Sequence, residues 1–140
     1  MRRSPYNHAL AQASIAVDTH TTGTVTGDTV DLIASGQRFR TAMIVVYTGA
    51  MTDGTHTISV QHAPDNDGSP GDWVDVPDDL LQGTAPAMDG DDDNEIFELG
   101  YVGHERFVRV VSTVADGANG GTYGALVILE QPHYPPVERS

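Results

Sequence analysis

At 140 residues the chain is long enough for one domain and leaves little room for a second. Twenty Asp and Glu residues against seven Arg and no Lys give a formal net charge of −13, which argues against partners such as nucleic acid or an anionic membrane surface. The absence of Cys excludes disulfides, a thiolate nucleophile and Cys-based zinc sites.

The N-terminal residues 1–20 mix small and polar side chains, and only Ala13 to Val17 indicates a short strand. We expect them to form an arm that is ordered through contacts with something else. No apolar run approaches the roughly 20 residues that span a bilayer. The stretch after Met1 is too mixed for a signal peptide, so we expect a protein made in the cytoplasm of its host cell.

The strongest strand pattern covers residues 39–48 (FRTAMIVVYT) and is continuous enough to be covered on both faces. Residues 55–62 alternate strictly, which places Ile58 and Val60 on an inner face. Between these two segments, Thr52-Asp53-Gly54 is a turn signal. The sequence therefore predicts a β-hairpin here.

The rest of the chain repeats this rhythm of apolar runs and turns. Further strands are predicted at 24–33, 73–76, 94–102, 105–114 and 122–130, with a helical turn at 78–81 and a flexible hairpin connection at 116–121. Three prolines in residues 131–140 indicate an extended tail. With about seven or eight strands over residues 21–130, we expect an all-β, antiparallel β-sandwich with N- and C-terminal arms. The pattern leaves an immunoglobulin-like and a jelly-roll topology equally open.

No constellation of catalytic side chains stands out. The six His residues show no metal-ligand spacing, and we interpret them as surface or strand-end imidazoles. There is no Gly-x-Ser-x-Gly motif and no glycine-rich phosphate loop that precedes a helix. We therefore expect no enzymatic activity and no cofactor.

Two acidic loops, at residues 65–71 and 89–94, are the places to look for a metal. Asp89, Asp91 and Asp93 alternate as in a calcium loop, but the Gly and the bidentate Glu of an EF-hand are missing. They are weak calcium candidates, and solvated loop acids are the plainer interpretation.

Trp73 is the only Trp, and we expect it to plug the core, with a carbohydrate-stacking platform as the alternative. Arg106 and Arg109 lie three apart in a strand and so on opposite faces. At most one of them faces the core, where it needs an acidic partner. The side chains that we expect to contact partners lie in the two arms: Arg2, Arg3, Tyr6, Tyr134, Pro135 and Pro136.

From Val30 to Pro136 the chain resembles a family of small structural proteins of tailed viruses, the minor capsid or capsid decoration (cement) proteins. The resemblance is most specific at Leu99–Gly103 (LGYVG), followed by Arg106–Val110 (RFVRV) and a glycine-rich connection. It implies a β-sandwich on the head surface of a virion. It also implies contacts with the major capsid protein or with copies of the chain itself, a trimer being one such oligomer.

The favoured function is therefore that of a virion structural protein that decorates and stabilises a capsid. A tail, neck or fibre component of the same kind of particle is one alternative, and copy number in the particle would separate the two. A carbohydrate-binding module that uses Trp73 and calcium is the second, and a glycan array with and without chelator would test it. The abundance of Asp without Lys suits either a halophilic origin or a genome that prefers Arg codons, and the sequence leaves this open.

Overall fold

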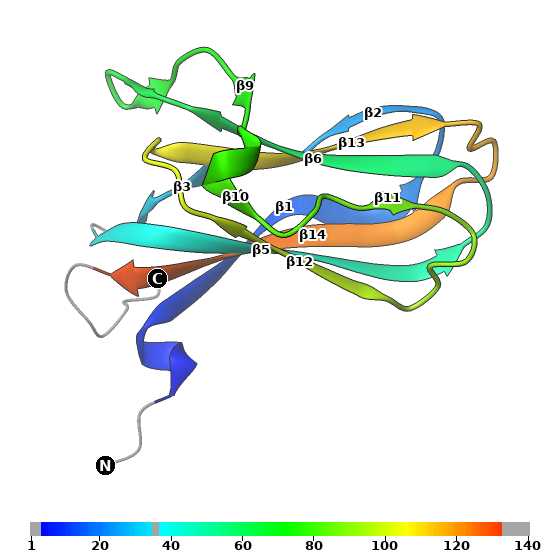
Figure 1. The fold of residues 1–140 in the computed structure, drawn as a ribbon, viewed down its shortest axis with the longest axis horizontal. Helices are drawn as coiled ribbons and strands as arrows, with labels where there is room; N and C mark the ends of the chain where they lie inside the picture. Colours follow the sequence, from blue (N-terminus) through cyan, green and yellow to red (C-terminus); the bar gives the residue numbers. More distant parts are fainter. Residues whose placement is uncertain (1–3, 35–36, 133–140) are drawn as a thin grey trace.

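The computed structural model describes residues 4–34 and 37–132, which fold into two β-sheets packed face to face (Figure 1). Sheet A has the strand order β1 (Ala9–His20), β14 (Gly121–Pro132), β5 (Gln37–Met51), β12 (Ile96–Tyr101) and β10 (Leu81–Gln82), and β4 (Ile33–Ala34) pairs with β5. Sheet B has the order β11 (Ala87–Met88), β6 (Thr55–Ala63), β13 (Phe107–Ala115) and β2 (Gly23–Thr26), with β3 (Val30–Asp31) on β13 and β9 (Val74–Asp75) on β6. The fold is an all-β sandwich of antiparallel strands, as predicted.

Short elements fill the connections. A two-stranded ribbon, β7 (Asp65–Asn66) and β8 (Ser69–Pro70), occupies the first acidic loop. The predicted helical turn is a 3₁₀-helix, η2 (Asp78–Leu80), and a second one, η1 (Pro5–Asn7), precedes β1. Among the described residues, no helix is long and apolar enough to cross a membrane.

The strand order resolves the topology that the sequence left open. In chain order the eight principal strands are β1, β2, β5, β6, β11, β12, β13 and β14. Sheet A then reads first, eighth, third, sixth, and sheet B reads fifth, fourth, seventh, second. This is the arrangement of a jelly roll, in which most consecutive strands alternate between the two sheets.

Both predicted hairpins are wrong for the same reason. The strands on either side of Thr52–Gly54 are β5 and β6, which belong to different sheets. Those on either side of residues 116–121 are β13 and β14, and they too belong to different sheets. Turns are present at both predicted places, but each turn carries the chain from one sheet to the other.

Asp53 joins these two crossings at one end of the sandwich. Its carboxylate accepts hydrogen bonds from the main-chain N–H groups of Gly120, at 2.6 Å, and Asn119, at 3.1 and 3.2 Å. In return, the N–H groups of Thr52 and Asp53 donate to the carbonyl oxygen of Gly120. These donors, Gly120 foremost, hold the pKa of Asp53 below its usual value.

The N-terminal arm is shorter than predicted. Residues 9–20 form β1, which pairs with β14 along its whole length except for two register shifts. Leu10 and Ile15 pack into the core, and this burial accounts for the strand. Of the predicted arms, residues 1–3 and 133–140 lie outside the described residues.

The core lies between the sheets and is built from alternate side chains of the long strands. Ile44 and Val46 of β5, Val127 of β14 and Val110 of β13 are fully buried. The predicted inner positions Ile58 and Val60 are confirmed. The expectation that residues 39–48 are covered on both faces is wrong, because the outward side chains of β5 include the exposed Met43 and Tyr47.

Two Tyr–His pairs connect the sheets through this core. Tyr123 of β14 contacts His56 of β6 edge to face, with an O–N distance of 3.0 Å, and Tyr101 of β12 meets His62 of β6 in the same way at 2.8 Å. Both imidazoles are buried, so the surface interpretation is wrong for these two His residues. Burial raises the pKa of both tyrosine hydroxyls, which therefore stay protonated and able to donate.

Candidate interaction surfaces

The outward face of sheet A is apolar. Three rows of outward side chains cross β1, β14, β5 and β12 in register: Ala11, Ile128, Met43, Gly100; then Ala13, Leu126, Val45, Glu98; then Val17, Gly124, Tyr47, Ile96. Glu98 is the only charged residue in the three rows. Tyr47, Val17 and Ile96 are each more than half exposed, at 55, 78 and 58%. A sheet that faces water normally alternates apolar inside with polar outside, and this one does not.

A groove of about 510 Å³ lies in this apolar face. Its walls are Val17 and Ala13 of β1 on one side and Val45 and Tyr47 of β5 on the other. Gly124 forms part of its floor: a Cβ there would lie 2.7 Å from Cγ2 of Val17, so any side chain would push Val17 aside. The groove therefore depends on a glycine in the middle of β14.

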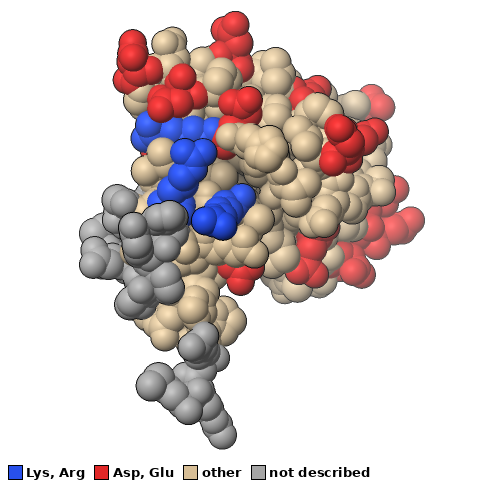
Figure 2. Space-filling model, turned by 60° about the vertical axis from the view of Figure 1, so that its left-hand side comes forward, with Lys and Arg blue, Asp and Glu red and all other residues tan. Residues whose placement is uncertain are grey.

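The basic residues gather at the opposite end of the sandwich from Asp53. Figure 2 shows arginine side chains gathered in one area of this face, with acidic side chains on the surface around them. A cleft of about 300 Å³ lies there, and Arg38, Arg40, Arg106 and His104 line it together with Glu105. Leu32 and Phe39, both buried, provide its apolar base.

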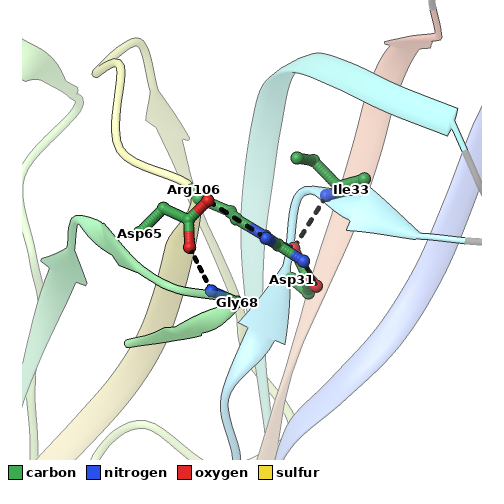
Figure 3. Close-up of polar contacts among 5 residues, drawn as sticks. All are labelled: Asp31, Ile33, Asp65, Gly68 and Arg106. Carbon is green, nitrogen blue, oxygen red and sulfur yellow. Dashed lines mark hydrogen bonds and ion pairs between the residues drawn. The ribbon is translucent and has the colours of Figure 1, made fainter. Parts of the chain in front are cut away.

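Arg106 is held in place by two carboxylates (Figure 3). Its Nε and Nη2 donate to the two oxygens of Asp31 at 2.9 and 2.8 Å, and its Nη1 donates to Asp65 at 3.2 Å. The pairing with Asp31 raises the pKa of Arg106. The expected acidic partner is thus present, although Arg106 lies at the rim of the sandwich and not in its core.

The two acids are themselves positioned by main-chain donors. Asp31 accepts from the N–H of Ile33 at 2.9 Å, and Asp65 accepts from the N–H of Gly68 at 2.8 Å (Figure 3). The hydrogen bond from Gly68, more than the charge of Arg106, holds the pKa of Asp65 below its usual value. Arg106 therefore connects the β3 region to the β7–β8 ribbon as a fixed wall of the cleft.

Arg38 and Arg40 differ from Arg106. Both are exposed and lie two residues apart on β5, hence on the same side of the strand. In the part of the chain that the structure describes, the only arginine–carboxylate ion pairs are those of Arg106. Sequence reasoning missed this pair, although two arginines in alternation before an apolar run (QRFRTAM) were visible.

Arg109 lies outside the cleft and on the other sheet. Its guanidinium stacks on the ring of Trp73 at 4.2 Å and donates twice to Oε1 of Gln61, its cross-strand neighbour, at 2.9 and 2.8 Å. Trp73 is half-buried on the outside of sheet B, so the predicted core plug is wrong. One face of its ring carries Arg109, which leaves less aromatic surface for a sugar.

The calcium candidates do not form a metal site. Asp89 accepts from the N–H of Asp91 at 2.9 Å, and Asp93 accepts from the N–H of Met51 at 2.6 Å. No group of three or more His, Asp or Glu residues within 4–34 and 37–132 is arranged to hold a metal ion. The acids of this loop shape its turns.

Of the predicted partner-contacting residues, the structure places only Tyr6. It lies in η1 and is 66% exposed. Arg2, Arg3, Tyr134, Pro135 and Pro136 lie outside the described residues.

Comparisons with known proteins give little further information. No family model and no curated protein matches the chain. Among solved structures, the crystal structure of PirA is similar over 93% of this chain and 97% of that one, with 16% sequence identity and a TM-score of 0.39. A likeness at that level carries no functional argument.

Proposed function

We propose that this protein is a structural subunit of a tailed-virus particle, a decoration protein that binds the outside of the major capsid shell. The observation that carries the proposal is the outward face of sheet A, where one of the twelve positions in three rows is charged. The largest exposed apolar patch of a protein is often a functional contact surface. The resemblance to decoration proteins and the jelly-roll fold, which recurs in capsid proteins, support the same function.

The size of the patch favours a shell as its partner. Four strands about 4.8 Å apart and three rows about 6.8 Å apart give roughly 400 Å². A stable pairwise interface needs about 800 Å² from each partner. A patch of half that size binds weakly alone, but many copies on a repeating shell, each also held by its neighbours, bind firmly through avidity.

A matched pair of variants tests this docking face. Tyr47→Glu places a charge in the middle of the apolar rows, whereas Thr57→Glu places the same charge at an exposed position on the outside of sheet B. Burial of an unpaired carboxylate costs several kcal/mol, so Tyr47→Glu should weaken co-sedimentation with purified particles at least tenfold. Thr57→Glu should bind like the wild type.

Two results would contradict the proposal at different points. Equal binding by both variants would show that sheet A is not the docking face. Failure of the wild-type chain to occur in purified particles would exclude the function itself. Mass spectrometry of particles adds the copy number: proportionality to shell subunits indicates decoration, and a few copies per particle indicate the tail or neck.

A further inference from the structure

The basic cleft of Arg38 and Arg40 is a second surface, separate from the three apolar rows on the outward face of sheet A. The chain carries 13 more acids than arginines, yet of the four arginines in residues 4–34 and 37–132 only Arg106 forms an ion pair. Arg106 binds two carboxylates, and the guanidinium of Arg109 is hydrogen-bonded to Gln61. Arg38 and Arg40 form no ion pair within residues 4–34 and 37–132, although Glu105 lines the same cleft.

Glu105 forms no ion pair with either arginine within the described residues. Its main-chain N–H donates to the hydroxyl of Tyr101 at 3.1 Å, and its negative charge contributes to the raised pKa of that hydroxyl. The two arginines therefore keep their hydrogen-bonding capacity for a ligand. His104, exposed at the rim, adds a further donor.

The spacing of the arginines indicates what kind of anion fits. Residues two apart on a strand present their side chains on the same side with about 6.8 Å between their Cα atoms. An extended peptide with carboxylates at alternate positions has the same repeat. Each guanidinium is a planar fork that matches one carboxylate with two parallel hydrogen bonds.

We propose that the cleft lined by Arg38, Arg40 and His104 binds an acidic peptide segment of a partner protein, in extended conformation and with Asp or Glu at alternate positions. Arg106, fixed by Asp31 and Asp65, forms a rigid wall for this segment. The net charge of −13 does not prevent binding, because at physiological ionic strength charges more than about 8 Å away are largely screened.

Fluorescence anisotropy with the full chain tests the proposal. The probe is a labelled short peptide with Asp at alternate positions, and its control carries Asn in place of Asp. Arg38→Gln and Arg40→Gln should each weaken binding roughly three- to tenfold, because each removes one partly exposed, charge-assisted contact. Glu105→Gln should tighten binding, because it removes an acid that lines the cleft.

Arg109→Gln is the matched control, since it removes the same charge from outside the cleft and should leave affinity unchanged. The proposal is overturned if Arg109→Gln weakens binding as much as the cleft variants do, because the effect is then one of net charge. It is also overturned if the Asn peptide binds equally well. Inorganic phosphate is then added as a competitor, at a concentration that supplies as many negative charges as the peptide. If phosphate displaces the peptide and its own binding also requires Arg38 and Arg40, the cleft is a small-anion site and the proposal is overturned.

Discussion

The two outward faces of this sandwich obey different rules. On sheet B three outward rows read Thr24, Thr113, Thr57, then Thr26, Val111, Ser59, then Arg109, Gln61, Asp75. The guanidinium, amide and carboxylate groups of the third row are hydrogen-bonded to one another. On sheet A the corresponding rows consist of Ala, Val, Leu, Ile, Met, Tyr and Gly with a single Glu. The outward rows of sheet B are largely polar and suit contact with water, whereas those of sheet A are largely apolar.

The difference is informative because both sheets belong to the same highly acidic chain. Twenty acids are available, yet nearly all lie outside the apolar rows of sheet A. Acids elsewhere keep the molecule soluble and oppose non-specific association. Their scarcity in the three apolar rows leaves that part of the face available for a specific partner.

The largest expected effect separates the inside of sheet A from its outside. Val46 and Val45 are neighbours on β5, but Val46 is fully buried in the core and Val45 faces outward. Val46→Ala should lower the free energy of unfolding by about 2–3 kcal/mol, through lost burial and a cavity. Val45→Ala should lower it by less than about 1 kcal/mol. Urea titration of both variants measures the difference.

Equal costs for the two variants would mean that the outer face is covered within the isolated chain. The contrast between the two outward faces would then be wrong, and the outward face of sheet A would not be available as a docking surface. Equal slopes of the two unfolding curves would confirm that both variants unfold from the same native structure.

Much of the fold was predictable from the sequence because it follows from local patterns. Strict alternation over residues 55–62 correctly placed Ile58 and Val60, and the strand at 39–48 is real. Turn residues located the ends of strands, but they could not tell a hairpin from a crossing, because that choice depends on which sheet the next strand joins. The hydrogen bonds of Asp53 to Asn119 and Gly120 span more than 60 residues, and no local pattern reveals them.

The candidate surfaces were harder to foresee. The apolar run at 42–47, within the predicted strand at 39–48, correctly indicated two apolar faces, but the described chain covers only one of them. Partner contacts were predicted in the two arms because polar, Pro-containing termini suit contacts with neighbouring subunits. An uncovered sheet face gives no signal in the sequence other than that apolar run. The buried His56 and His62 were missed because an imidazole enters a core only when a partner such as a Tyr hydroxyl is present, and such pairs are visible only in three dimensions.

A second prediction uses the charge of the whole molecule to sharpen the comparison. Near the isoelectric point, about pH 4.4, repulsion between copies disappears and exposed apolar surface can associate. We expect the wild-type chain to form dimers or larger species there and to be monomeric at pH 7. Tyr47→Lys should require roughly tenfold higher concentration to associate, because a charge would have to be buried. Sedimentation velocity measures both.

Thr57→Lys is the control for that experiment, because it changes the net charge equally on the outside of sheet B. It should associate like the wild type at its own isoelectric point. If Thr57→Lys suppresses association as strongly as Tyr47→Lys, both outward faces contribute equally to self-association. The apolar character of sheet A then has no effect on association in solution.

The smallest expected effect concerns the connection that carries the chain from one sheet to the other. Asp53 receives main-chain hydrogen bonds from Gly120 and Asn119, and these lower its pKa in the folded state. A carboxyl whose pKa is lower when folded than the unfolded value of about 3.9 stabilises the fold above that pH, and the contribution is lost as pH falls through the folded pKa. Asp53→Asn should therefore melt at a lower temperature than the wild type at pH 7, and this difference in melting temperature should narrow as the pH falls from about 4 to about 2.

Asp72→Asn is the control, because it removes the same charge from an exposed position. Its melting temperature should stay close to that of the wild type at every pH. Thermal melts over this pH range test the prediction. A constant difference in melting temperature for Asp53→Asn would show that the variant loses a hydrogen-bond acceptor and not a charge, so that the charge of Asp53 does not stabilise the crossing between the sheets.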